Sequence, residues 1–357
     1  MDVANEGTRL SSDEQDFWQR LLAAESHPQK AWAVFDSLRA PERNGGAVVA
    51  SRILSATERD RAAKASVAPL RSFFSHNAGI LGPADLPEIY LESKNLPPAL
   101  FYRGDTECLS RPLVAIVGTR AASTYGKAAA QKFSEALARS GATIVSGGAL
   151  GIDAAAHRGA LSVGGKTVAV LLTDIERVYP RVHFGLFEQI KQNGCLLSQF
   201  AIGAVSTKDY RPLMRNQTVA GLCSALIVVE APERSGALST AAAANELGRH
   251  VFVVPANIDN VNFRGSHSLI RDGATLVDHP DQVLEILGLA GSSSPVPETP
   301  VSDIQRRILA ALGSNPVTTE FIVTKSELDT SVVLSELTIL ELEGRIFKDR
   351  GGYAIRL

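Results

Sequence analysis

Two short segments of this chain combine glycine with residue types that bind anions. Gly118, Thr119 and Arg120 follow the apolar run LVAIV, and Ser146 with Gly147 follows a second such run. Both segments precede a helix-like stretch, whose first backbone amides attract anions, and an arginine adds two parallel donors that fit a phosphate. The two turns therefore predict a phosphate-binding surface. A tight turn with a surface arginine is the alternative interpretation of the first one.

The glycine spacing argues against two common nucleotide-binding motifs. The first turn does not read GxGxxG, and the second strand ends in Ser146-Gly147-Gly148 rather than in an acidic residue that would hold a ribose. The chain also lacks GxxxxGK[ST], the motif of P-loop nucleotidases. We therefore expect no nicotinamide cofactor and no other cofactor.

A basic segment near residue 210 has a composition that suits a single strand of nucleic acid. It places three cations around one aromatic ring: Lys208, Arg211, Arg215 and Tyr210. Cations can follow the phosphates while the ring stacks on a base. This pattern is weak by itself, since a basic helix start is common.

Ser235 and Gly236 follow the apolar run ALIVVE and precede an alanine-rich stretch. Small residues at this point allow a backbone to approach a ligand closely. Tight packing of the alanine-rich helix on a sheet explains them equally well.

Ser146, Asp153 and His157 are residue types of a nucleophilic hydrolase site. Asp153 and His157 lie four residues apart, so they share one helical face. Ser146 is not in a GxSxG nucleophile elbow. We expect instead that Asp153 holds loop amides and that His157 is a packed, hydrogen-bonded helix residue.

Composition and length describe a globular chain without export or membrane signals. The 357 residues are 45% hydrophobic and 21% charged, and no apolar run is long enough for a transmembrane helix. The N-terminus is polar, and the three cysteines fit neither a disulfide framework nor a zinc site. We expect a cytoplasmic protein with no metal and no membrane contact.

The net charge of −2 conceals a basic middle segment. Residues 111–215 contain 13 Lys and Arg against 6 Asp and Glu, a net charge of +7, whereas 1–110 carries −3 and 216–357 carries −6. Such an asymmetry indicates an anionic partner. A solvated basic surface is the alternative.

Strand and helix candidates alternate between residues 111 and 288. Six runs rich in Val, Ile and Leu are strand candidates: LVAIVG, ATIVSG, TVAVLL, CLLSQ, ALIVVE and HVFVVP. Continuously apolar runs fit strands that are buried on both faces. The sequence thus predicts an α/β fold with a doubly wound parallel sheet, whose ligands lie at the carboxyl ends of the strands.

Composition also divides the chain into domains. We expect a helical N-terminal domain at 1–90, the α/β domain at 91–290, a linker at 291–301 and a winged helix at 302–357. The long helix of a winged helix usually reads DNA. Here it carries Glu336, Glu341 and Glu343 and no basic residue, so phosphates would be repelled along it.

Together these segments resemble the DprA/Smf family, the bacterial DNA-processing proteins of natural transformation. The resemblance covers roughly residues 85–290 and includes VAIVGTR, IVSGGALGIDAAAH, GGKTVAVL, VYP, LLSQ, ALIVVEA, SGALSTA and VFVVP in order. The C-terminal LTILELEGRIFKDRGGYAIRL also looks like the winged helix of that family.

The resemblance implies an extended Rossmann-like fold that binds single-stranded DNA without sequence preference. Family members protect incoming strands, load the recombinase RecA, act as dimers and are not known as enzymes. By motif match, the residues at the phosphates would be Gly118, Thr119, Arg120, Ser146, Gly147, Arg215 and Asn216.

This chain departs from the family pattern at three places. Leu150 stands where an arginine is usual, and Gln217 stands where a second basic residue usually follows Arg-Asn. Pro212-Leu213 replace an aromatic-proline pair, for which Tyr210 is a candidate substitute. Two absent cations would lower the salt-dependent part of a DNA affinity.

Two further functions stay open from the sequence: a Rossmann-like enzyme or sensor for a small nucleotide, and an interaction protein. Related Rossmann-like nucleotide glycosidases carry PGGxGTxxE with a catalytic glutamate, whereas the comparable RSGALSTAAAANE lacks the glycine pair and places Glu246 well inside a helix. An interaction role, in which the acidic winged helix binds a protein, is compatible with DNA binding.

Overall fold

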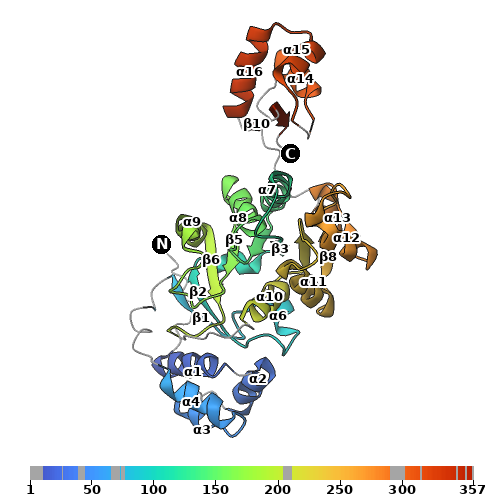
Figure 1. Cartoon of the computed structure of the whole chain (residues 1–357). Helices are drawn as coiled ribbons and strands as arrows, with labels where there is room; N and C mark the ends of the chain where they lie inside the picture. Colours follow the sequence, from blue (N-terminus) through green and yellow to red (C-terminus); the bar gives the residue numbers. More distant parts are fainter. Residues whose placement is uncertain are drawn as a thin grey trace. The chain divides into compact units, whose positions relative to one another are not determined.

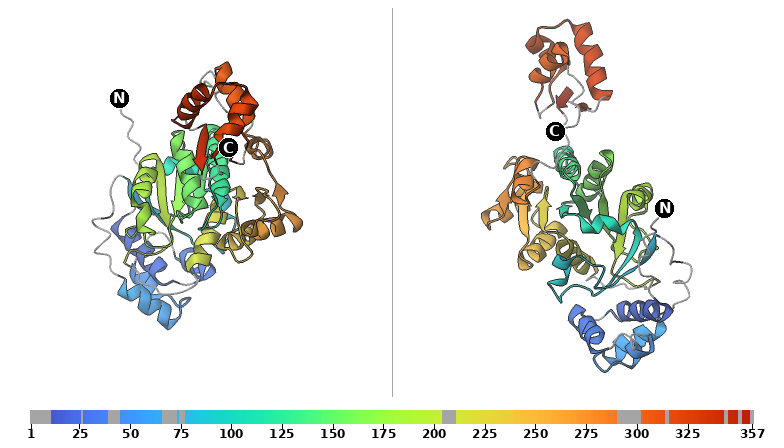
Figure 2. Two further views of the ribbon diagram at one scale, coloured as in Figure 1. Left: turned by 45° about the horizontal axis from the view of Figure 1, so that its top comes forward. Right: turned by 180° about the vertical axis from the view of Figure 1, so that it is seen from behind.

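The computed structural model describes residues 11–25, 27–38, 45–65, 73, 77–203, 211–289, 302–313, 316–342, 345–349 and 352–355. The chain divides into two units, Met1–Ser292 and Ser293–Leu357, and each is described by itself (Figure 1). Among the helices within these ranges, none is both long and apolar enough to cross a membrane. Figure 2 shows the elements from two further directions.

The described N-terminal residues form α1 (Ser12–Ala23), α2 (Pro28–Ser37), α3 (Gly45–Ala50) and α4 (Ala56–Lys64). Ser11 caps α1: its hydroxyl accepts from the Glu14 amide, while the Glu14 carboxylate accepts from the Ser11 amide. This reciprocal pair is a capping box, which fixes the start of α1.

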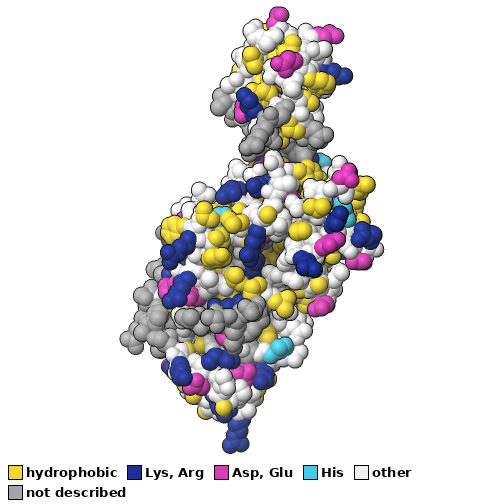
Figure 3. All heavy atoms as spheres, viewed as in Figure 1, with side chains coloured by type: hydrophobic (Ala, Val, Ile, Leu, Met, Phe, Trp, Pro, Cys, Tyr) yellow, Lys and Arg dark blue, Asp and Glu magenta, His cyan; other side chains and the backbone are white. Residues whose placement is uncertain are grey.

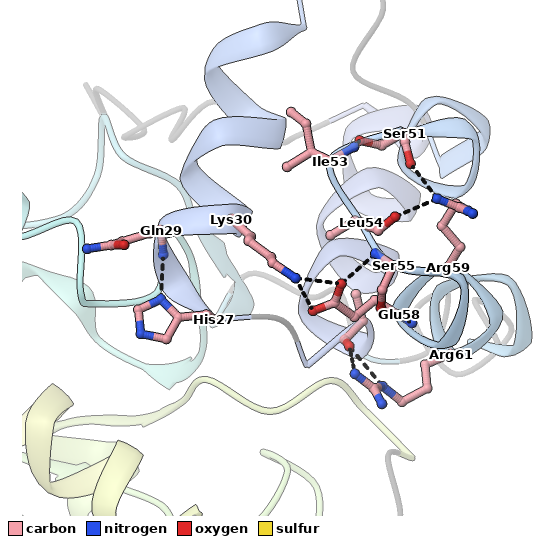
Figure 4. Close-up of polar contacts among 11 residues, drawn as sticks. His27, Gln29, Lys30, Ser51, Ile53, Leu54, Ser55, Glu58, Arg59 and Arg61 are labelled. Atoms are coloured by element: carbon pink, nitrogen blue, oxygen red, sulfur yellow. Dashed lines mark hydrogen bonds and ion pairs between the residues drawn. The ribbon is translucent and has the colours of Figure 1, made fainter.

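Polar contacts close the ends of these helices (Figure 4). Glu58, which is 8% exposed, accepts from the Ser55 amide at 2.6 Å and from Lys30 at 3.2 Å. Arg61 of α4 donates to the carbonyl of Ala24 at the end of α1. The bonds to the Ser55 amide and the Ala24 carbonyl satisfy backbone groups at helix ends, and the Lys30–Glu58 pair joins α2 to α4.

Within the described residues, nine strands form a sheet at the centre of the first unit, in the order β1-β2-β6-β5-β4-β3-β7-β8-β9. The strands are β1 (Ala78–Leu81), β2 (Leu100–Gly104), β3 (Leu113–Val117), β4 (Thr143–Ser146), β5 (Thr167–Val170), β6 (Gly194–Ser198), β7 (Ala225–Val228), β8 (His250–Val253) and β9 (Thr275–Leu276). Neighbouring strands are parallel throughout the part of the sheet that runs from β6 through β3 to β9. At the other end, β2 pairs antiparallel with both β1 and β6. The doubly wound parallel sheet predicted from the six apolar runs is confirmed for these runs, which form β3 to β8.

Helices cover both faces of this sheet, which explains the continuously apolar strands. Val114 and Ile116 of β3 belong to one buried cluster with α7 (Thr124–Arg139) and α8 (Ile152–Ser162). Ala115 and Val117 belong to another, with α10 (Arg211–Leu222) and α11 (Gly236–Glu246). Figure 1 shows α7, α8 and α9 (Phe184–Asn193) on the face opposite to α10 and α11.

One strand lies in the region that the sequence predicts to be helical. The four residues of β1 are too few to show a periodicity, and their place is fixed by antiparallel pairing with β2, where Ile80 lies opposite Phe101. Ile80 and Phe101 share a buried cluster with Phe17 of α1. This cluster joins the N-terminal helices to the sheet.

The remaining elements of the first unit are short and complete its edges. They are α6 (Glu88–Leu91), α12 (Arg264–Arg271), α13 (Pro280–Ile286) and the 3-10 helices η2 (Thr106–Ser110), η3 (Arg181–His183) and η4 (Val261–Phe263).

The second unit contains α14 (Asp303–Ala311), α15 (Thr319–Ser326), α16 (Thr330–Leu342) and a hairpin of β10 (Ile346–Asp349) and β11 (Gly352–Ile355). These are the elements of the predicted winged helix. Leu337 of α16 is buried with Ile308 and Ile322, while Leu334 and Ile339 are exposed. No Lys or Arg occurs in α16, and the predicted Glu343 lies outside the described residues.

Candidate nucleic-acid interface

The chain builds the sheet outward from β3 in one direction and then from β7 in the other, so the strand order reverses between these two neighbours. A cavity of about 260 Å³ opens at their carboxyl ends. Ligands of doubly wound sheets bind at this point. The Thr119 amide donates to the Glu230 carbonyl at 2.7 Å and holds the two strand ends together. Most of the predicted site residues line the cavity: Gly118, Thr119, Arg120, Arg215, Asn216, Ser235 and Gly236.

Arg215 reaches this cavity from α10 as a buried cation. The residue is 8% exposed, and its Nη1 lies 3.8 Å from the Asp153 carboxylate. Its Nε has no hydrogen-bond partner among the described residues. Burial lowers the pKa of the Arg215 guanidinium, Asp153 opposes that shift, and the positive charge of Arg120 adds to it. A charge that is buried and incompletely partnered gains from a bound anion.

Arg120 stands at the same cavity on the turn after β3. It is exposed, and among the described residues no hydrogen bond or ion pair engages its guanidinium. Its charge acts on Arg215 across the cavity, so the two cations repel each other when no ligand separates them. We call Arg120 and Arg215 the arginine pair.

Asp153 and His157 play the structural roles expected of them. Asp153 Oδ2 accepts from the Gly147 amide at 3.2 Å and the Ala149 amide at 3.3 Å, which fixes the turn after β4. Burial raises the pKa of Asp153, although Arg215 and these amides act in the opposite direction. His157 is fully buried against Thr167, and burial lowers its pKa to about 3.

Ser146 completes the argument against a hydrolase triad. Its hydroxyl is 0% exposed and donates to the Ile116 carbonyl at 2.6 Å. The side chain therefore joins β4 to β3 and does not line the cavity. Gly147 lies next to it, where the absence of a side chain leaves room for the Arg215 guanidinium.

Glu230 takes the anion position at the N-terminus of α7. Its carboxylate is 0% exposed and accepts from the Ser123 amide at 3.0 Å, the Ser123 hydroxyl at 2.7 Å and Asn262 Nδ2 at 2.9 Å. Gly126 leaves the space that this carboxylate fills. In dinucleotide-binding folds a pyrophosphate lies at this helix end. In this protein the Glu230 carboxylate already fills that place, so the start of α7 is closed to an external anion.

Asn216 and Ser235 shape the far wall of the cavity. Asn216 Nδ2 donates to the Gly236 carbonyl at 3.1 Å and to Ser239 Oγ at 2.8 Å, so both of its N–H groups are engaged. Ser235 caps α11 by accepting from the Ala237 amide. These contacts hold α10 against the start of α11 and thereby position Arg215.

The structure separates Arg211, another of the predicted cations, from the cavity. Arg211 is 8% exposed, pairs with Glu25 at 3.0 Å and lies over the ring of Phe200, 4.4 Å from its centroid. Its guanidinium thus joins α10 to the N-terminal helices. Lys208 and Tyr210 lie outside the described residues. The DNA-contact roles of all the predicted site residues stay predictions.

Sequence reasoning missed two groups near the arginine pair. Arg234 is exposed and lines the cavity, one residue before Ser235 in the turn after β7. Its position in the sequence, directly beside a turn predicted to contact the ligand, could have identified it. Tyr179 lines an adjoining pocket together with Leu150, and only the fold brings this ring to the arginine pair. In the part of the chain that the structure describes, no cluster of His, Cys, Asp or Glu could hold a metal ion.

Comparison with protein families gives two matches that cover most of the chain. Residues 79–288 match the model of DNA recombination-mediator protein A, and residues 292–352 match the DprA winged helix domain. The chain belongs to the DprA family. Protein Smf of Escherichia coli K12 is 36% identical over 284 residues, which cover 76% of each chain. DprA of Streptococcus pneumoniae is 42% identical over 202 residues, covering 57% of this chain and 70% of the relative.

Solved structures agree with this family membership. The crystal structure of DprA from Streptococcus pneumoniae matches with a TM-score of 0.66 and 31% identity, over 78% of this chain and 98% of that one. DprA from Helicobacter pylori, described for its single-stranded DNA binding mode, matches with a TM-score of 0.54 and 30% identity. The match covers 59% of this chain and 95% of that one.

Proposed function

We propose that the cavity binds the phosphate backbone of single-stranded DNA without sequence preference. The observation that supports this best is the arginine pair, in which Arg215 is buried and incompletely partnered while Arg120 is exposed. A phosphodiester offers the acceptor oxygens that both guanidinium groups need. Contacts to the sugar-phosphate backbone of DNA carry no sequence information, which is consistent with binding to a DNA strand of any sequence.

We further infer that this chain, as a cytoplasmic homodimer, protects incoming strands and loads RecA during transformation and recombination. Its membership of a family described as recombination mediators supports this inference. The single-stranded DNA binding of the Helicobacter pylori relative supports it as well.

The proposal contains no catalytic step. Asp153, Glu230 and His157 are buried and bonded to neighbouring protein groups, so none of them is placed as a general acid or base. Glu246, the last residue of α11, lines a different cavity together with Glu25 and His27. These positions support binding rather than hydrolysis of a nucleotide.

Fluorescence anisotropy of a labelled poly-dT oligonucleotide tests the proposal. The variants are Arg120→Ala and, as a matched control, Arg139→Ala. Arg139 is exposed in the last turn of α7 and does not line the cavity, so the control removes an equal charge outside the proposed site.

We expect salt-dependent binding by the wild type and the control. In Arg120→Ala the salt slope should be lower by ~0.7 for each phosphate that the variant no longer neutralises. Equal weakening in both variants would show that only the total charge matters. No binding of wild type at low salt would refute the proposed function.

A further inference from the structure

A small pocket adjoins the cavity and shares the arginine pair with it. Arg120 and Arg215 line both spaces, together with Ala149. The remaining wall of the small pocket is largely apolar and consists of Gly147, Leu150, Leu172, Tyr179 and Pro180. On the face of the first unit seen in Figure 3, Lys and Arg side chains are likewise interspersed with hydrophobic ones.

Tyr179 is the aromatic ring of this wall and is 54% exposed. Within the described ranges, no other ring, cation or hydrogen-bond partner engages it. Tyr125 makes a useful contrast: it is 37% exposed, but its hydroxyl donates to the Pro255 carbonyl at 2.7 Å and its ring packs on Phe263. An exposed ring without a structural role, beside two cations, points to a ligand with a flat face.

The loop that carries Tyr179 is fixed to the phosphate-binding turn. His183, in η3, is 5% exposed, and its Nδ1 donates to the Gly148 carbonyl at 3.1 Å. Gly148 directly follows Gly147, whose open space holds the Arg215 guanidinium. The ring and the arginine pair are therefore held on one framework, which lowers the entropy cost of binding both parts of a ligand.

From this arrangement we propose that Tyr179 stacks on a nucleobase of the strand whose phosphate meets the arginine pair. The inference rests on the proposed binding of single-stranded DNA and adds a base subsite to it. Leu150, which is 43% exposed and stands where the family pattern has an arginine, widens the apolar wall under the base. Stacking accepts every base, so the subsite adds affinity without sequence preference.

Two strands of equal length separate base contacts from phosphate contacts: poly-dT, and an abasic oligonucleotide with the same sugar-phosphate chain. Tyr179→Ala should bind poly-dT roughly 5- to 150-fold more weakly than wild type, the range expected when one base no longer stacks. Its affinity for the abasic strand should not change. Tyr179→Phe keeps the ring and should bind like wild type. Val182→Ala is the matched control, because Val182 is 76% exposed but lines neither space.

A fluorescent reporter gives a second, independent measurement. Tyr179→Trp places an indole at the subsite, while the natural Trp18 and Trp32 are each 4% exposed and lie in the N-terminal helices. Poly-dT should quench the new indole by stacking, and the abasic strand should leave its emission unchanged.

Each outcome decides the inference. If Tyr179→Ala leaves poly-dT binding intact while Arg120→Ala weakens it, the base subsite is wrong and the phosphate site stands. If Tyr179→Ala weakens both strands equally, the ring shapes the protein or binds something other than a base. If the wild type binds neither strand, the proposed function and the subsite fail together.

Discussion

Replacing Gly147 with alanine should weaken DNA binding, although residue 147 has no side chain to lose. A Cβ at this position would overlap the Arg215 guanidinium and come within 2.9 Å of Asp153 Oδ2. Gly147 is not among the glycines with positive φ, so alanine adds no backbone strain and the effect is steric. The guanidinium would have to leave its position beside Asp153.

The expected magnitude follows from what Arg215 contributes. A hydrogen bond to a charged group contributes ~1.5–3 kcal/mol, so a displaced guanidinium should raise Kd by about 10- to 150-fold. The salt slope should fall by ~0.7 if the displaced guanidinium no longer neutralises one phosphate. Asp153, left without its cation, can take up a proton because burial already raises its pKa.

A double-mutant cycle on poly-dT binding tests this reasoning. Gly147→Ala, Arg215→Ala and the double variant are titrated with the oligonucleotide at several salt concentrations. If Gly147 acts only by making room for Arg215, the double variant should bind no more weakly than Arg215→Ala. Gly185→Ala serves as the control, since a Cβ there meets nothing within 4 Å. Additive effects, or normal binding by a folded Gly147→Ala protein, would refute the steric argument.

Three other substitutions test the frame around the site. Gly126→Ala should lower the free energy of unfolding by ~1–3 kcal/mol, because its Cβ would overlap the buried Glu230 carboxylate; urea denaturation measures this. The pKa of His157 falls from 6.5 to about 3 on folding, so the unfolded chain binds a proton that the folded chain does not. Stability should therefore fall as pH drops from about 6.5 toward 3, and His157→Gln should show a shallower decline over that window. Arg211→Ala should lower the melting temperature by removing the Glu25 pair, yet change poly-dT affinity far less than removal of either member of the arginine pair.

The central part of the sheet was predictable because the six apolar runs that form β3 to β8 each carry their own signal. Runs such as LVAIV in β3 are apolar at every position, which distinguishes a strand covered on both faces from one exposed to water. The four residues of β1 have no such signal, since antiparallel pairing with β2 decides their conformation. Short edge strands depend on tertiary pairing that local sequence does not show.

The fold class predicts site residues only where they lie in a turn directly after a recognisable strand. Gly118, Thr119 and Arg120 stand at the carboxyl end of a recognisable strand, so the fold class alone places them at the cavity. Arg211 has the residue type of a phosphate ligand, but a distant Glu25 engages it. Tyr179 lies far from both turns in the sequence, and only the fold brings it to the arginine pair.

The most direct measurement is a crystal structure of the protein with a short poly-dT oligonucleotide. We expect a phosphate within hydrogen-bond distance of both Arg120 and Arg215, in the cavity at the carboxyl ends of β3 and β7. A strand bound elsewhere on the protein, with neither arginine touching a phosphate, would contradict it.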